Sequence, residues 1–188
     1  LRIGSTDVLA GAWGSGSAPG IQLFVPRADE ADVLGALRDA GMRHGVAEGD
    51  LAVLEVLRGE AGLPRFGAEL GPDTLPAELG LVERTVSFTK GCYTGQEVVA
   101  RMHSRGRVGQ RLIGIVLDDG ALPEPGAEVR AEGARVGAVT SAVRSPRAGA
   151  IALGIVRRGS DAPDTPLDVG GRPARAVALP FTLPTASR

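Results

Sequence analysis

Residues 111–156 read RLIGIVLDDGALPEPGAEVRAEGARVGAVTSAVRSPRAGAIALGIV, and this stretch decides the fold class that we expect. Runs of strand-like apolar alternation recur in it about every eight to twelve residues, and glycine punctuates them. Such spacing is typical of a small antiparallel barrel or sandwich. The pattern predicts strands at 111–117, 127–131, 136–143, 150–156 and, beyond the quoted stretch, 175–179. Glu132-Gly133 and Gly170-Gly171 are predicted hairpin turns.

The sequence before this stretch has a mixed helix and strand pattern. Residues 21–25 predict a short buried strand, and a helix follows Asp29 with Gly41 at its C-terminal cap. A second helix is expected over 50–58, followed by a long ordered loop over 59–80. The pattern changes near Gly106, which we take as the domain boundary. We therefore predict an α+β protein, with an α/β part at 1–106 and the barrel at 107–188.

Composition excludes several classes of protein. The 188 residues carry a net charge of −1 without a basic face, which argues against nucleic-acid binding. No apolar run approaches the roughly 20 residues that cross a bilayer, so no membrane association is expected. The single cysteine rules out an internal disulfide and favours a reducing, cytoplasmic location. His44 and His103 lie too far apart in the sequence to suggest a metal site with it.

One octapeptide, Lys90-Gly91-Cys92-Tyr93-Thr94-Gly95-Gln96-Glu97, carries the clearest chemical signal. It holds the only lysine, cysteine and tyrosine of the chain, and a capping box at Thr94 to Glu97 predicts that a helix starts there and runs to Gly106. A helix start and a nearby lysine both favour the thiolate form of a cysteine. Cys92 and Lys90 are therefore the candidate catalytic residues. The alternative is a small buried Cys92 beside a solvated Lys90.

The octapeptide, together with Val86 to Thr89 before it, resembles the signature of the YgfZ-type folate-binding proteins. This family is tied to iron–sulfur cluster maintenance and is related to the aminomethyltransferases of glycine cleavage. The equivalent transferase segment usually lacks the cysteine, so Cys92 favours the YgfZ branch. The resemblance implies a folate-binding α/β domain, truncated at its N-terminal side, before a β-barrel. Residues 135–153 resemble the family's barrel.

The resemblance also implies a cofactor and its contacts. The segment from Arg58 to Gly62 resembles the family segment whose glutamate, here Glu60, reaches the pterin of tetrahydrofolate or a derivative. A carboxylate suits this role because it accepts two hydrogen bonds from an aminopyrimidine edge. Arg58, Tyr93 and Gln96 are further candidate cofactor-binding residues. The alternative for Glu60 is a solvated acid at a helix end.

Three functions follow from these expectations. The first is a folate-binding accessory protein for iron–sulfur cluster assembly or repair, which uses Cys92 and has iron–sulfur proteins or their assembly factors as partners. The second is a tetrahydrofolate-dependent aminomethyltransferase. The third is a non-enzymatic interaction module with a vestigial folate site. Full family members carry an additional N-terminal region, which we expect to lie outside this chain.

Overall fold

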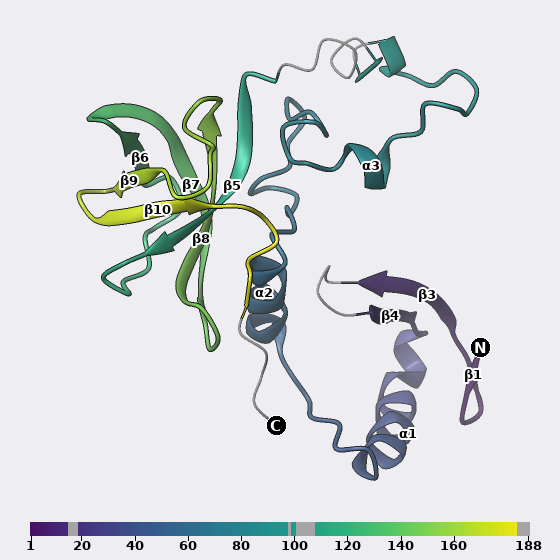
Figure 1. Ribbon diagram of the computed structural model, residues 1–188. Coiled ribbons are helices and arrows are strands. Elements are labelled where there is room, and N and C mark those ends of the chain that lie inside the picture. Colours follow the sequence, from purple (N-terminus) through teal and green to yellow (C-terminus); the bar gives the residue numbers. More distant parts are fainter. Residues whose placement is uncertain (15–18, 98, 101–107, 184–188) are drawn as a thin grey trace. The chain divides into compact units, whose positions relative to one another are not determined.

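The computed structural model describes residues 1–14, 19–97, 99–100 and 108–183. The chain divides into two compact units, Leu1–Leu57 and Arg58–Arg188 (Figure 1). The domain boundary expected at residues 106 and 107 lies outside the described residues and stays a prediction.

The second unit contains the expected barrel. Six antiparallel strands close it in the order β10-β5-β8-β7-β6-β9. These strands are β5 (Gln110–Leu117), β6 (Glu128–Ala131), β7 (Ala134–Ser145), β8 (Gly149–Arg157), β9 (Pro166–Val169) and β10 (Pro173–Val177). All five predicted strands are confirmed. The sixth, β9, is not predicted by the pattern, because it begins with Pro166 and a proline within a short apolar run argues against a strand.

The two predicted hairpin turns are also confirmed. Glu132 and Gly133 have φ values of 51° and 79°, and Gly170 and Gly171 have 60° and 85°. Two successive positive φ angles are the requirement of a type I′ turn, whose twist matches that of the strands it joins.

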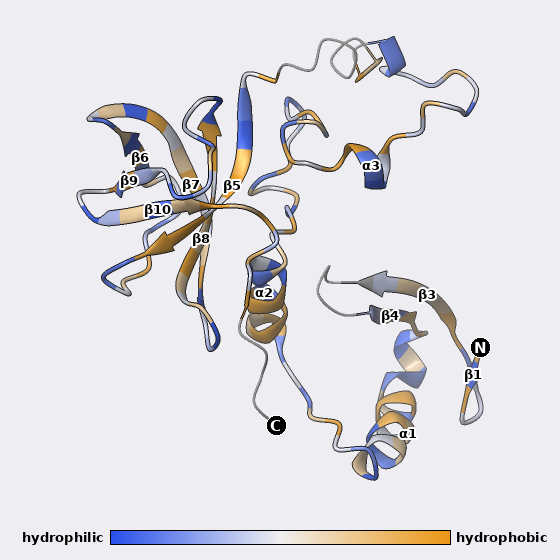
Figure 2. Ribbon diagram, in the orientation of Figure 1, coloured by the Kyte–Doolittle hydropathy of each residue, from blue (hydrophilic) through white to orange (hydrophobic). Residues whose placement is uncertain are grey.

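The barrel interior is an apolar core. Ile115, Val129, Val156 and Ala176 are fully buried in it, each from a different strand. Figure 2 shows hydrophobic residues along much of β8, whose two faces are both covered. Its outward side chains, Ile151 and Leu153, pack against Phe181 in a second cluster. The segment after β10 therefore covers the outside of the barrel and contacts the end of a helix there, because the Phe181 N–H donates to the Glu60 carbonyl.

The first unit holds two small antiparallel hairpins and a helix. Its elements are β1 (Arg2–Ile3), β2 (Thr6–Asp7), β3 (Leu9–Gly14), β4 (Pro19–Phe24), η1 (Arg27–Asp29) and α1 (Glu30–Met42). The helix after Asp29 is confirmed, and so is a strand at 21–25, but the prediction that this strand is buried is wrong: Ile21 and Phe24 of β4 are 72% and 55% exposed. The cap prediction for Gly41 is wrong: Gly41 lies inside α1, and the positive φ, 67°, falls at Gly45.

Two further helices frame the long loop. The predicted second helix is confirmed as α2 (Leu51–Glu60), and the Asp50 carboxylate caps it by accepting from the Val53 N–H at 3.0 Å. The short α3 (Val82–Thr85) follows the loop and was not predicted. Gln96, Glu97, Val99 and Ala100 are helical as expected. The predicted helix end at Gly106 lies outside the described residues.

Candidate functional site

The C-terminal end of α2 is packed onto the outside of the barrel. Arg58, Gly59 and Glu60 are all buried, and the Phe181 N–H donates to the Glu60 carbonyl at 3.1 Å. Gly59 permits this approach, because a Cβ atom there would lie 2.7 Å from Cγ2 of Val143 on β7. The contact places two charged side chains of α2 against β7.

A bulge in β7 provides their partners. The register of β7 against β8 shifts between Val139 and Ser141. Val139 and Ala142 both belong to the barrel core, so the alternation of inward and outward side chains changes at this bulge. Ser141 and Ser145 consequently face the 58–69 segment.

Glu60 is a buried carboxylate with two barrel partners. Its side chain is 1% exposed, and Oε1 accepts a 2.6 Å hydrogen bond from Ser145 Oγ. Arg147 approaches both oxygens: its Nε lies 3.5 Å from Oε1, and its Nη2 donates to Oε2. Burial alone would raise the pKa of Glu60, but the hydrogen bonds from Arg147 and Ser145 and the charge of Arg147 outweigh it and lower the pKa. Glu60 is therefore ionised at neutral pH.

Arg58 lies in a second buried network. Its Nη1 donates to the Leu63 carbonyl at 2.6 Å and to Glu69 Oε2 at 3.3 Å, and its Nη2 donates to Ser141 Oγ at 3.1 Å. Ser141 in turn donates to Glu69 Oε1 at 2.6 Å, and the Arg65 N–H donates to Glu69 Oε2 at 2.9 Å. These bonds fasten the long loop to the barrel. Contact between Arg58 and a cofactor stays a prediction.

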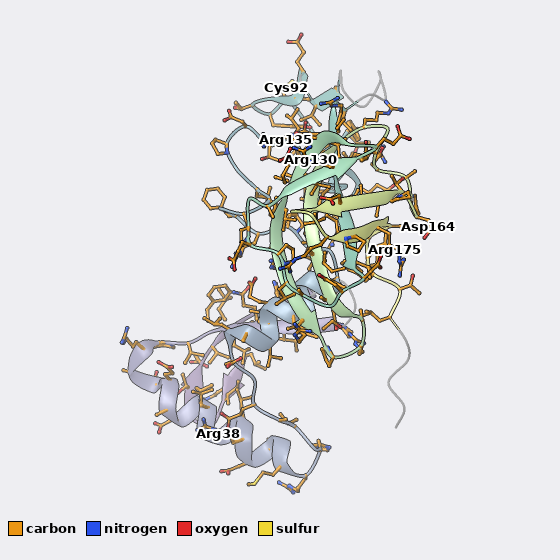
Figure 3. The ribbon with its side chains drawn as sticks, turned by 90° about the vertical axis from the view of Figure 1, so that its left-hand side faces the viewer. Arg38, Cys92, Arg130, Arg135, Asp164 and Arg175 are labelled. Atoms are coloured by element: carbon orange, nitrogen blue, oxygen red, sulfur yellow. The ribbon has the colours of Figure 1, made fainter. Side chains whose placement is uncertain are left out.

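A cavity of about 490 Å³ opens beside the Glu60 cluster. Arg147 lines it, together with the apolar side chains Val116, Val177 and Phe181 and the guanidinium of Arg175. The Arg175 Nη1 lies 3.8 Å from Asp164 Oδ1, which makes a weak ion pair (Figure 3). Two arginines on an apolar wall suit a ligand with a flat apolar part and negative charge.

Residues 90–97 form a second candidate site. Cys92 is exposed, which contradicts the alternative of a small buried cysteine (Figure 3). The Lys90 Nζ lies 4.6 Å from the centroid of the Tyr93 ring, within range of a cation–π contact. The Gln96 side chain accepts from the Tyr93 N–H at 3.3 Å and so caps the helical turn. Tyr93 Oη is buried and has no hydrogen-bond partner among the described residues. Catalytic and binding roles for these four residues stay predictions.

The sequence analysis missed several residues of the Glu60 cluster. Arg147, Ser145 and Glu69 carry no sequence signal of their roles there. Glu69 lies eleven residues after Arg58, and only the structure, in which Glu69 is buried and accepts from Arg58, pairs the two residues.

Comparisons with known proteins relate this chain to the aminomethyltransferases. Residues 110–182 match the family model of the glycine cleavage T-protein C-terminal barrel domain. The chain is 36% identical over 167 residues to an aminomethyltransferase of Moorella thermoacetica, which covers 86% of this chain and 45% of that protein. The chain is distantly homologous to aminomethyltransferases over most of its length.

Two further matches extend this relation. An aminomethyltransferase of Saccharopolyspora erythraea is 35% identical over 189 residues, covering 96% of this chain and 50% of that protein. The crystal structure of glycine cleavage system aminomethyltransferase T from Bartonella henselae has a TM-score of 0.74 at 25% identity, over 90% of this chain and 48% of that one. The chain thus spans about half the length of the relatives it matches. These relatives favour the aminomethyltransferase alternative over the iron–sulfur reading.

No group of three or more His, Cys, Asp or Glu side chains among the described residues could hold a metal ion. His103 lies outside them. No helix in the described part of the chain has the length and apolar character needed to cross a membrane.

Proposed function

We propose that this chain contributes to tetrahydrofolate-dependent one-carbon transfer of the aminomethyltransferase kind. The observation that carries the proposal is the buried, ionised Glu60, held by Ser145 and Arg147 beside a cavity of about 490 Å³. The homology to aminomethyltransferases supports it, since that family uses tetrahydrofolate.

The hydrogen bonds of Glu60 fit this ligand chemically. The aminopyrimidine edge of a pterin offers two parallel N–H donors, which is also what a guanidinium offers to a carboxylate. Arg147 presents such a pair to Glu60 and is one-third exposed, whereas Glu60 itself is buried. Arg147 thus occupies the place at Glu60 that we assign to the pterin. A pterin that reaches Glu60 would replace or share the hydrogen bonds that Arg147 makes to this carboxylate.

The remaining residues of the cavity suit the rest of a folate. Val116, Val177 and Phe181 offer apolar contact for the ring system, and Arg175 offers positive charge for a carboxylate. When bound, tetrahydrofolate supplies the nitrogen atoms that accept the one-carbon unit. The residues of this chain bind and orient it, and positioning of this kind supplies much of the rate in reactions between two bound groups.

Calorimetric titration with 5-formyltetrahydrofolate tests the proposal. We expect binding by the wild type and a loss of about tenfold or more in affinity for Glu60→Gln, because one of two paired acceptors is lost. Glu78→Gln is the control, since the Glu78 carboxylate accepts from the Leu75 N–H away from this cluster. Equal affinity of wild type and Glu60→Gln, with both folded by circular dichroism, would sink the assignment of Glu60.

A second function is favoured by one specific observation, the exposed Cys92. A folate-binding protein of the YgfZ type, which supports iron–sulfur enzymes, would use this thiol. The discriminating test is complementation of a deletion strain by Cys92→Ala. Loss of iron–sulfur enzyme activity with unchanged folate binding would favour this second function. Full complementation would exclude a role for the Cys92 thiol in the support of iron–sulfur enzymes.

A further inference from the structure

A second cavity of the barrel unit lies beside the turn that follows α2. Its volume is about 440 Å³, within the range of small-molecule sites. Its wall is built by that turn, the loop around α3, strand β5 and the segments that flank the β9–β10 hairpin. The cavity shares Pro163, Val177 and Ala178 with the cavity beside Glu60, but neither Glu60 nor Arg147 lines it. It is therefore a separate candidate binding site.

The wall of this second cavity is aliphatic. Its larger apolar side chains include Leu63, Leu79, Leu112, Ile113, Val177 and Leu179. No aromatic side chain of the described residues lines it, whereas Phe181 lines the cavity beside Glu60. A flat ring system gains from stacking on an aromatic face, and this wall offers no such face. The wall therefore favours a ligand with an aliphatic body.

Two arginines and one acid line the same cavity. Arg84 of α3 is exposed, and its guanidinium makes no hydrogen bond or ion pair with any residue that the structure describes. The Nε of Arg111 on β5 lies 3.6 Å from Asp161 Oδ2, which is too long for a hydrogen bond. The other oxygen of Asp161 accepts from the Gly159 N–H at 2.8 Å and is thereby held in its own turn. Two positive charges and one negative charge leave the lining at +1, with guanidinium donors available for an anion.

We propose that this cavity binds an aliphatic carboxylate, with its hydrocarbon chain on the leucine-rich wall and its carboxylate against Arg84 and Arg111. A guanidinium and a carboxylate match in geometry and form charge-assisted hydrogen bonds. A monocarboxylate carries one negative charge at neutral pH, which balances the net charge of the lining. The proposal uses neither Glu60 nor tetrahydrofolate, so its failure would leave the proposed function untouched.

Octanoate is the probe that tests this site. The full 188-residue chain with ¹³C-labelled leucine and isoleucine methyl groups reports where octanoate binds. We expect the methyl resonances of Leu79, Leu112 and Ile113 to shift and to saturate, with a dissociation constant of about 1 mM or below. Octan-1-ol has the same hydrocarbon chain without the charge. It should bind about threefold more weakly or worse, because its hydroxyl makes no charge-assisted pair.

Substitutions of the charged lining residues test whether the carboxylate is recognised. Arg84→Gln and Arg111→Gln should each weaken octanoate binding about threefold or more, since each removes a positive charge from the cavity. Asp161→Asn should strengthen binding about twofold or more, because the acid that competes for Arg111 is lost. Damage to the fold would not raise the affinity, so this opposite sign separates charge recognition from unfolding. Arg172→Gln is the matched control, because the Arg172 Nε lies 3.7 Å from Asp119 Oδ2 outside the cavity.

Three outcomes would overturn the proposal. One is that octanoate shifts only methyl groups of residues 1–57, which would mean association with the exposed apolar side chains of that unit. Another is equal affinity for octanoate and octan-1-ol, since the carboxylate would then go unrecognised. The third is an affinity of Arg84→Gln and Arg111→Gln equal to that of Arg172→Gln.

Discussion

Ser145 makes three hydrogen bonds with one hydroxyl group. It donates to Glu60 Oε1 at 2.6 Å and accepts from the N–H groups of Arg147 and Ala148 at 3.0 and 2.9 Å. These bonds use the full capacity of a hydroxyl. We expect Ser145→Ala to lower the free energy of unfolding by about 1–3 kcal/mol, since a buried carboxylate loses a donor.

Urea denaturation measures this loss. Ser87→Ala is the control, because Ser87 Oγ accepts a single exposed bond from the Lys90 N–H. Its effect should stay within about 0.5 kcal/mol, as for most surface substitutions. Equal losses in the two variants would contradict a special role for Ser145.

Glu60 should make the stability of the barrel depend on pH. Its pKa in the folded protein is lowered, because the bonds and charge of Arg147 and the bond of Ser145 outweigh burial. Such a group stabilises the fold above its unfolded pKa of about 4.3, and this contribution is lost as the pH falls through the folded pKa. We therefore expect the difference in unfolding free energy between wild type and Glu60→Gln to be constant near neutrality and to shrink below about pH 4. Urea titrations at a series of pH values measure it, and a difference that persists into strong acid would contradict the ionised state.

A substitution of Arg147 tests whether this residue occupies the place of the pterin at Glu60. If its guanidinium occupies the place of the pterin, Arg147→Met should raise the affinity for 5-formyltetrahydrofolate, because the ligand no longer competes for Glu60. Methionine keeps apolar contact with the cavity wall. Isothermal titration calorimetry on the variant and on Arg175→Met separates the two arginines. A weakening by Arg147→Met would mean that Arg147 holds the ligand instead.

At the scale of elements, β7 determines which residues can form the site. The sequence pattern predicted a strand over 136–143, but a pattern of alternating residues contains no sign of the bulge between Val139 and Ser141. A bulge reverses the faces of the residues that follow it. The pattern therefore gives no sign that Ser141 and Ser145 donate to the buried acids Glu69 and Glu60. The pairing of Arg147 with Glu60 depends on which α2 residue packs against the turn that carries Arg147. The sequence pattern does not contain that information.

The close approach of β7 to β8 gives an element-scale prediction. A Cβ atom on Gly137 would lie 2.1 Å from the Ile155 carbonyl oxygen, which is backbone and cannot rotate away. We expect Gly137→Ala to cost about 1–3 kcal/mol or more through strand displacement. Gly109→Ala is the control, since nothing lies within 4 Å of a Cβ there. Thermal unfolding compares the two, and a midpoint for Gly137→Ala equal to that of Gly109→Ala would contradict the close contact.

At the scale of the whole molecule, the two units differ in how much apolar surface they bury. The barrel holds the main core. Its strands were predictable because they place apolar residues toward this core and regular turns separate them. The first unit was only partly predictable: its strand at 21–25 was found, while β1, β2 and β3 are short or glycine-rich and give weak patterns. An element that buries few side chains has a weak apolar pattern in its sequence and contributes little to the stability of the fold.

This difference predicts two separable unfolding transitions. Trp13, the only tryptophan, lies in the first unit, so its fluorescence reports that unit alone. Far-ultraviolet circular dichroism at a strand wavelength is dominated by the barrel. For the chain by itself we expect the fluorescence midpoint in urea to precede the dichroism midpoint, because coincident curves require a single cooperative unit.

A deletion provides the control for this prediction. A chain of residues 51–188 keeps α2, both buried acid networks and the barrel. Its dichroism midpoint should lie close to the second transition of the full chain, since the removed residues contribute little to the barrel core. Coincident curves in the full chain, together with a lower midpoint after deletion, would show that the first unit stabilises the barrel.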